Sequence, residues 1–596
     1  MLDETQNITE ESLPAWNLSS LFSNPDGSDL AAAQSKLEVL VSSFSDNYSD
    51  KVSTLLSRGF VQAVSDYEEI EDLMGQISSY SQLYYSQNVS DKGRSRFYQN
   101  TSDFLTSLSS HILFFELEIN RLDNSQIERL LAEKSATRLV PWVRDLRIIK
   151  PHQLSNDVER LLHEKSLTSR RAWIRLFDET EAGLQCYINK KSITLTKALN
   201  YLSDANSKTR ENAAHAISTA LNEKSDVFCF ITNVVAKDKA IDDDWRNYSS
   251  SISSRNIANL LEDHVVDALV ATVQGSYEKT SHRYYRLKAD WLNKTQLNFW
   301  DRNAPLPGSN DSIISWGEAK EIVLASYKGF SPTMGEIGSE FFEKNWIDAA
   351  PSPGKASGAF SHPTVPSANP FILLNYMGSQ RDVMTLAHEL GHGVHQVLAA
   401  EQGPLLCNTP LTLAETASVF GEMLTFRQLL NNISSKEEKR VLIANKIEDM
   451  LNTVVRQIAF HLFEAEVHAE RRNGELSLER INQIWMQVQS DSLGPAIRLD
   501  KAYECYWMYV SHFVHVPFYV YAYAFGDCLV NSLYKVYSEK TIINFEERYL
   551  ELLRSGGKFR HKELLLPFGL DASNPLFWSK GIQSITDLID ELEELF

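Results

Sequence analysis

The chain has 596 residues, of which 43% are hydrophobic and 23% are charged, and its formal net charge is −20. This length exceeds what one compact lobe usually holds, so we expect two lobes. The negative charge argues against a nucleic-acid partner, because phosphate binding needs a basic face. Five scattered cysteines without a CxxC pair argue against a disulfide scaffold and a cysteine zinc site. Together with an acidic, polar N-terminus unlike a signal peptide, these features predict a cytoplasmic protein.

Most of the first 200 or so residues predict helices, because apolar residues recur there at spacings of three and four. The clearest of these patterns lie at 29–44, 66–85 and 104–122. Helical patterns resume at 207–224 and 259–273. Further helices are expected at about 410–430, 436–472 and 477–490. The sequence therefore predicts a mainly α fold.

The helical pattern is interrupted at 351–370, a stretch rich in Pro, Gly and Ser, which mark loops. Directly after it, the short apolar run "FILLNYM" (371–377) predicts an edge strand of a small sheet. Ser379 or Asp382 is then expected to cap a helix that begins near Val383.

The aromatic segment 505–526, "CYWMYVSHFVHVPFYVYAYAFG", carries no formal charge and is long enough to span a bilayer. It also holds two histidines, a proline, a serine and five tyrosines. Such polar groups are costly in lipid unless they have partners. We therefore expect a buried, functional segment and no membrane span.

The stretch "TLAHELGHGVH" (385–395) contains the HExxH pattern. On a helix, His388 and His392 lie one turn apart on the same face, so both imidazoles can bind one zinc ion. Glu389 lies beside the first histidine, where a carboxylate can accept a proton from an activated water. Glycines at positions 391 and 393 weaken a helix, which suggests that another backbone approaches closely.

His395 returns to the same helix face, but seven residues rise about 10.5 Å along a helix. Two ligands of one zinc ion lie only about 3.4 Å apart. A straight helix cannot meet both conditions. His395 is therefore expected to support the site or to face the substrate.

The third ligand should come from the next helix, where Glu415 and Glu422 share one face. Glu415 could instead complete a capping box with Thr412. Thr409–Pro410 is the better helix start, which leaves Glu415 inside the helix and free to bind the metal. We predict Glu415 as the ligand and Glu422 as the partner that orients a ligand histidine. Cys407 is a weaker candidate for the third ligand.

These motifs resemble the oligoendopeptidase F branch of the thimet-oligopeptidase family of zinc metallopeptidases. The matching stretches are the HExxH pattern, "GKASGAF" (354–360), "PFILLNY" (370–376), "LAETASVFGE" (413–422) and "SHFVHVPFYVYAYAFG" (511–526). The resemblance extends from about residue 207 to the C-terminus, and more faintly through the N-terminal part. HExxH alone is shared by many peptidases, whereas these elements in this order are specific.

The resemblance implies a mainly helical fold of two lobes that flank a deep substrate channel, with a small β-sheet near the zinc site. It implies a helical N-terminal domain over residues 1–200 and a catalytic domain over residues 201–596. The implied cofactor is one Zn²⁺ ion. The implied substrates are short to medium unstructured peptides rather than folded proteins.

The resemblance also implies roles for individual residues. Three residues match the family's zinc ligands and one matches its general base: His388, His392 and Glu415, and Glu389, respectively. His512 and a downstream tyrosine match the groups that bind substrate and stabilise the oxyanion, and Tyr523 is favoured as that tyrosine. Four other side chains are expected to bind substrate or to compete for these roles: His395, His515, Tyr519 and Tyr521.

We therefore expect a zinc-dependent oligoendopeptidase, with two alternatives open. A zinc carboxypeptidase with the same metal site would need a cation for the terminal carboxylate, and Lys355 or Arg381 could supply it. A helical peptide-binding protein would carry the same pattern without turnover. The sequence makes no prediction of oligomeric state.

Overall fold

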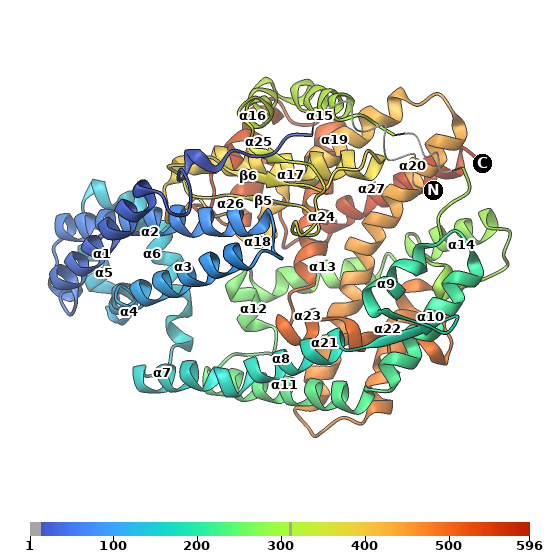
Figure 1. Ribbon diagram of the computed structural model, residues 1–596, viewed down its shortest axis with the longest axis horizontal. Helices are drawn as coiled ribbons and strands as arrows, with labels where there is room; N and C mark the ends of the chain where they lie inside the picture. The colour runs from blue at the N-terminus through green and yellow to red at the C-terminus, as the bar shows by residue number, and fades with distance from the viewer. Residues whose placement is uncertain (1–12, 309–312) are drawn as a thin grey trace. The chain divides into compact units, whose positions relative to one another are not determined.

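The computed structural model describes residues 13–308 and 313–596. Most of these residues lie in α-helices, joined by short turns and accompanied by three small sheets (Figure 1). The predicted mainly α fold is confirmed. The N-terminal residues 1–12, whose composition argues against a signal peptide, lie outside the described residues.

By its internal contacts, the chain divides into two compact units. Unit 1 comprises residues 1–150, 311–432 and 540–569, and unit 2 comprises residues 151–310, 433–539 and 570–596. Each unit is therefore built from three stretches that are far apart in the sequence. The predicted channel between two lobes and the predicted domain boundary near residue 200 remain predictions.

Unit 1 contains helices and one three-stranded sheet (Figure 1). Its N-terminal helices are α1 (Ser28–Tyr48), α2 (Ser57–Ser86), α3 (Lys92–Ser110), α4 (Phe114–Arg121), α5 (Asn124–Leu130) and α6 (Val140–Leu146). Its later helices are α15 (Trp316–Phe330), α16 (Pro332–Glu343), α17 (Gln380–Ala399), α18 (Leu411–Ala414), α19 (Thr416–Asn432), α25 (Phe545–Arg554) and α26 (His561–Leu565). Its strands are β4 (Ile347–Asp348), β5 (Phe360–His362) and β6 (Phe371–Leu373).

Unit 2 contains helices and two two-stranded sheets. Its first helices are α7 (Asn156–Lys165), α8 (Arg170–Ala182), α9 (Leu195–Asn200), α10 (Ser207–Asn222), α11 (Ser225–Trp245), α12 (Ser253–Ala258), α13 (Asp263–Gln274) and α14 (Ser281–Trp291). Its later helices are α20 (Lys436–Thr453), α21 (Val455–Arg471), α22 (Leu478–Leu493), α23 (His512–His515), α24 (Tyr521–Ser538) and α27 (Pro575–Glu593). Its strands are β1 (Gln185–Ile188), β2 (Lys191–Thr194), β3 (Leu297–Asn298) and β7 (Ile497–Arg498).

Three of the predicted helices are each divided in the structure, and one of them, expected at about 410–430, is shared by α18 and α19. The pattern at 104–122 is shared by α3 and α4, because the chain turns at 111–113. The pattern at 436–472 is shared by α20 and α21, which meet at Val454. Val454 lies within a run of three β-branched residues, and these lower helix propensity.

The small sheet of unit 1 has the strand order β4-β6-β5. The prediction of an edge strand at 371–377 is therefore wrong, because β6 is the central strand and ends at Leu373. All three of its residues are fully buried, as expected for a central strand covered on both faces. One neighbour of β6, the strand β5, could not be predicted from the sequence, because it lies inside the Pro-, Gly- and Ser-rich stretch that predicts a loop.

Helix α17 packs most extensively against α19. Ser379 is the N-cap of α17 and forms a capping box with Asp382, so the helix begins at Gln380 rather than near Val383. A Cβ atom at Gly391 would lie 2.5 Å from the carbonyl oxygen of Ala417 in α19. The absence of a side chain at this position therefore lets the two helix backbones come close together.

The aromatic segment 505–526 does not form one continuous helix. It comprises a 3₁₀ turn (Tyr506–Tyr509), α23, a connecting turn and the start of α24. Among the described residues, no helix combines the length and the apolar character that crossing a membrane requires.

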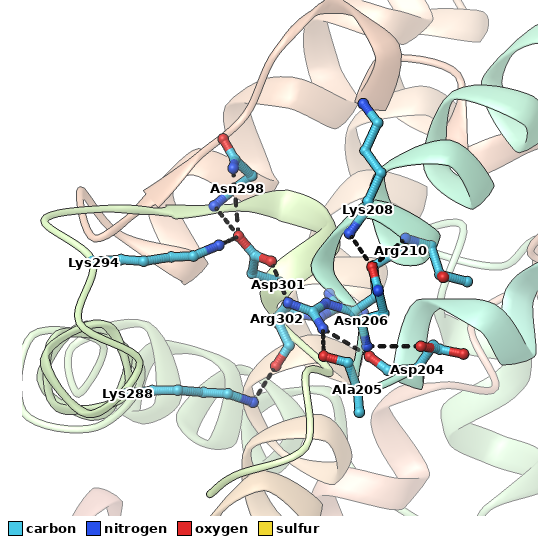
Figure 2. Close-up of polar contacts among 11 residues, drawn as sticks. Asp204, Ala205, Asn206, Lys208, Arg210, Lys288, Lys294, Asn298, Asp301 and Arg302 are labelled. Atoms are coloured by element: carbon cyan, nitrogen blue, oxygen red, sulfur yellow. Dashed lines mark hydrogen bonds and ion pairs between the residues drawn. The ribbon is translucent and has the colours of Figure 1, made fainter.

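A buried ion-pair network stabilises unit 2 around Asp301, whose side chain has no exposed surface (Figure 2). The Asp301 carboxylate accepts hydrogen bonds from Arg210 at 2.7 Å and from Lys294 at 2.5 Å. The Arg210 guanidinium also donates to the backbone carbonyls of Asp204 and Ala205. Because removing one partner of such a buried pair typically costs about 3–5 kcal/mol, the network holds the start of α10 against the turn that carries Asp301.

Gly391→Ala is expected to destabilise the protein, although alanine is the better helix former. The added methyl group would lie 2.5 Å from the Ala417 oxygen and 2.6 Å from the Ser418 Cα atom, so α17 and α19 must separate. Overpacking of this kind costs about 1–3 kcal/mol, whereas the gain in helix propensity is only about 1 kcal/mol. Thermal unfolding should show a lower melting temperature.

Gly329→Ala is the matched control, because Gly329 also lies in a helix of unit 1, α15, and a Cβ atom there meets nothing within 4 Å. It should leave the melting temperature unchanged or raise it. A Gly391→Ala variant as stable as the Gly329→Ala variant would contradict the close packing of α17 on α19.

Candidate active site

Helix α17 carries His388 and His392 on one face, and Glu415 approaches them from the start of α19. The Nε2 atoms of the two histidines are 3.2 Å apart, and Glu415 Oε2 lies 3.5 Å from each of them. The ligands of one tetrahedral zinc ion are expected to be about 3.4 Å apart. Two imidazole nitrogens and one carboxylate oxygen are also a donor set that suits zinc. The residues present therefore fit a zinc ion.

Glu415 lies between two helices rather than inside one. The predicted cap at Thr409 is wrong, because Pro410 is the N-cap of the single turn α18, and Glu415 follows as its C-cap. Helix α19 begins immediately afterwards, at Thr416. The Ser418 hydroxyl donates a hydrogen bond of 2.6 Å to Glu415 Oε2, the same oxygen that faces both histidines. Ser418 thus helps to orient the candidate ligand.

Both imidazoles have a further hydrogen-bond partner. His388 Nδ1 lies 2.5 Å from Glu422 Oε1, and the His392 ring is hydrogen-bonded to the backbone of Ala414. A proton held on Nδ1 by Glu422 leaves the lone pair of Nε2 available for a metal. This is the contact expected of a side chain that orients a ligand histidine.

Glu389 is buried, with 7% of its surface exposed. Burial raises the pKa of its carboxyl group to about 7, although the charge of His388 and a hydrogen bond from the Ser361 backbone act in the opposite direction. A carboxyl group with a pKa near neutrality can both accept a proton and donate it at physiological pH. Ser361 lies in β5, so this strand runs beside the candidate general base.

His395 is also buried, and it contacts a different partner from the other two histidines of the motif. Its Nε2 atom lies 3.1 Å from the Thr409 hydroxyl, and only 4% of the residue is exposed. Burial lowers the pKa of the ring to about 4, so it is neutral at physiological pH. The hydrogen bond to Thr409 fixes the orientation of the ring.

A cavity of about 610 Å³ borders the two histidines in the second half of the motif. His392 and His395 contribute to its wall, together with Thr409, Ala414 and the proline-rich stretch 363–370. Among the described residues that line it, none is an aspartate, glutamate, lysine or arginine. The cavity therefore offers an uncharged environment.

Three further candidate residues come together in unit 2, on α23, on α24 and in the turn between them. His512 Nε2 lies 3.3 Å from the Tyr523 hydroxyl oxygen. The ring centroid of Tyr519 is 5.3 Å from that of Tyr523 and 6.0 Å from that of His512. Burial lowers the pKa of His512, which favours the neutral ring. These contacts make His512 and Tyr523 a hydrogen-bonded pair.

Tyr521 points into the core of unit 2. It has no exposed surface, and its hydroxyl accepts a hydrogen bond of 2.8 Å from Asn259. The expectation that Tyr521 competes for the substrate-binding role is therefore wrong. Tyr521 is the first residue of α24 and projects into the core, whereas Tyr523, two residues further along this helix, projects to a different side.

His515 is engaged by a carboxylate. Its Nε2 atom lies 2.6 Å from Asp178 Oδ1, on α8. Its expected contact with substrate remains a prediction.

Two residues that support the candidate site, Ser418 and Ser361, were not among the predicted site residues. Ser418 could have been found from its spacing, because a residue three positions after Glu415 lies beside it on a helix. Ser361 carried no such signal, since it lies in the stretch that predicts a loop.

Two protein-family models and several known proteins match the sequence of this chain. The model of peptidase family M3 matches residues 323–584, and the oligopeptidase F model matches residues 118–185. Oligoendopeptidase F homolog of Borreliella burgdorferi is 25% identical over 587 residues, which cover 98% of each chain. Oligopeptidase PepF of Bacillus subtilis is 25% identical over 553 residues, which cover 90% of this chain and 80% of the relative.

Two solved structures share the fold. A protein from Chlamydophila abortus has a TM-score of 0.85 at 21% identity and covers 98% of each chain. Oligoendopeptidase-F from Enterococcus faecium has a TM-score of 0.71 at 20% identity, with 95% of this chain and 98% of that chain covered.

Glu415→Ala is expected to lose zinc while the protein stays folded, because it removes one of three closely spaced donors. The loss of affinity should exceed the roughly 10- to 100-fold effect typical of residues that only orient a ligand. Zinc content after dialysis, measured by mass spectrometry, reports the difference.

His395→Ala is the matched control, since it removes a buried side chain from the same site without removing a predicted ligand. It should retain zinc. A zinc-free His395→Ala variant beside a zinc-loaded Glu415→Ala variant would reverse the ligand assignment.

Proposed function

Because this chain belongs to the oligoendopeptidase F branch of peptidase family M3, we propose that it is a zinc-dependent endopeptidase. Its proposed substrates are short to medium unstructured peptides. The observation that carries the proposal is the spacing of 3.2–3.5 Å among the donor atoms of His388, His392 and Glu415.

Different residues of the chain bind the metal, transfer the proton and stabilise the oxyanion in the proposed reaction. His388, His392 and Glu415 would hold a zinc ion, which would supply Lewis-acid activation of the peptide carbonyl and of a water molecule. Glu389 accepts a proton from the attacking water and later delivers it to the leaving amine. The oxyanion of the tetrahedral intermediate needs a hydrogen-bond donor, and we assign this role to Tyr523, with His512 as the second candidate.

We propose that the peptide lies along β5. The order β4-β6-β5 makes β5 an edge strand, and its central residue, Ser361, lies beside Glu389. Pairing through backbone groups would tolerate many sequences. The uncharged cavity beside His392 and His395 favours neutral side chains near the cleaved bond.

The carboxypeptidase alternative is weakened by the environment of Lys355. Its side chain is only 2% exposed, and it donates a hydrogen bond of 2.6 Å to Asp348 Oδ1. A lysine already paired in this way is a poor partner for a terminal carboxylate. Arg381, in the first turn of α17, is the remaining candidate.

The proposal is tested with a fluorogenic peptide that is blocked at both ends. We expect cleavage at an internal bond, loss of activity in a chelator and recovery on addition of zinc. Cleavage of free-ended peptides alone would favour a carboxypeptidase. Zinc binding without any turnover would favour the peptide-binding protein.

Glu389→Gln is expected to keep zinc and to lower turnover by roughly 10²-fold or more, because an amide cannot accept the proton. The same peptide and a zinc determination measure both effects. Retention of more than about a tenth of the wild-type rate would remove Glu389 from the role of general base.

Tyr523→Phe is expected to lower kcat by about 10²- to 10³-fold, with a smaller change in KM. The hydroxyl is proposed to bond an oxygen that carries full charge only in the intermediate, so its loss acts mainly on the transition state. The phenyl ring preserves the packing, so zinc content and folding should not change.

The same substitution at Tyr519 and at Tyr521 provides the controls. Tyr521→Phe should affect stability rather than kcat, because it removes a buried hydrogen bond to Asn259. A large loss at Tyr519 with a normal rate at Tyr523 would move the role to Tyr519. Normal rates in all three variants would leave the role to a histidine.

A further inference from the structure

The turn between α23 and α24 has an unusual backbone conformation. Phe518 has a φ of 60°, in the left-handed region that residues with a Cβ atom seldom adopt. The turn connects His512, on α23, with Tyr523, on α24, and it also carries Tyr519. The conformation at Phe518 therefore affects how the two members of the hydrogen-bonded pair meet.

Three ionisable side chains hold this turn through its backbone. Glu464 of α21 accepts a hydrogen bond of 2.9 Å from the Phe518 N–H group. Arg170 of α8 donates to the His515 carbonyl at 2.7 Å, and Arg255 of α12 donates to the Pro517 carbonyl at 3.4 Å. A carboxyl oxygen meets a backbone donor and two guanidinium groups meet backbone acceptors, so each side chain offers the hydrogen-bonding group that the turn requires.

The aromatic ring of Phe518 is held as well. It packs against His461 and His468 of the same helix, α21, with centroid distances of 6.0 and 4.9 Å. Glu464 lies between these histidines in the sequence and on the same side of the helix. Helix α21 therefore contacts both the backbone and the side chain of the residue in the left-handed conformation.

Burying the carboxyl group of Glu464 is unfavourable in free energy, so a residue that only fills space would be apolar at this position. It is 2% exposed, and its second carboxylate oxygen has no hydrogen-bond partner among the described residues. Burial raises the pKa of its carboxyl group to about 8, although the Phe518 N–H group and the charges of Arg255 and Lys239 act in the opposite direction. An apolar side chain would avoid this desolvation.

We propose that Glu464 is a positioning residue for the reaction: by holding the Phe518 N–H group, it keeps the turn in the left-handed conformation that sets Tyr523 against His512. The inference rests on the proposed function of Tyr523 and deepens it. Glu464 does not touch the reacting atoms in this proposal. It acts through the turn.

The test compares Glu464→Met with Glu464→Gln. Methionine keeps the length and the helix propensity but removes the acceptor, whereas glutamine keeps an acceptor for the Phe518 N–H group. Glu464→Met should lower kcat by roughly ten- to hundredfold with little change in KM, and Glu464→Gln should restore most of the loss. Zinc content should be unchanged in both variants.

Glu466→Met is the matched control, because it makes the same substitution at an exposed site two residues further along α21. It should retain the wild-type kcat. Arg170→Met removes a different contact with the turn and should lower kcat in the same manner. It replaces Glu464→Met as the test if that variant does not fold.

A double-mutant cycle decides whether the effect passes through Tyr523. In the Tyr523→Phe background, Glu464→Met should cause little further loss, because both changes remove the same contribution. A full additional loss in that background would overturn the proposal, as would a wild-type kcat for Glu464→Met.

A spectroscopic measurement separates this proposal from the proposed function. With 3-fluorotyrosine in place of Tyr523, the fluorine resonance should shift or broaden in Glu464→Met and not in Glu464→Gln. If Tyr523→Phe has a normal kcat, the oxyanion role is wrong, and the fluorine resonance still reports whether Glu464 positions the tyrosine. An unchanged resonance in Glu464→Met overturns the positioning role whatever Tyr523 does.

Discussion

The close contact between α17 and α19 determines the geometry of the candidate metal site. At Gly391 the two backbones are so near that a methyl group would overlap the Ala417 carbonyl. This distance allows Glu422 on α19 to contact His388 on α17, and Ser418 on α19 holds Glu415 near both histidines. With a larger residue at Gly391, the helices would separate and the donor atoms would no longer share one centre.

The two groups of candidate residues follow the same arrangement, in which each reactive side chain has a partner that fixes its orientation. His388 has Glu422, Glu415 has Ser418, and Tyr523 has His512. These side chains are partly buried, and in such surroundings hydrogen bonds are stronger than in water, so the partners limit the side chains to few orientations. The same reasoning extends to the backbone at Phe518.

A site residue can be predicted from the sequence when the residues that form its pattern are close together in the chain. The His388–His392 pair and the reach of Glu415 and Glu422 follow from helical spacing, which a sequence shows directly. The central position of β6 does not, because its neighbour β5 consists of three residues inside a Pro- and Gly-rich stretch. Tyr521 illustrates a third case. Its inward direction follows from its position as the first residue of α24, and the sequence pattern does not show where that helix begins.

Each unit is assembled from three distant stretches of the chain, and this has a consequence for how the protein is made. Helix α25 packs against α17, and α27 packs against α24, α20 and α13, so the last tenth of the chain completes both units. At a synthesis rate of about 5–20 residues per second, α13, the first of these helices in the chain, waits roughly a quarter of a minute to one minute for α27. Until then their apolar faces stay partly uncovered, and closing such long loops slows folding. The protein should therefore depend on protection from aggregation while it is still attached to the ribosome.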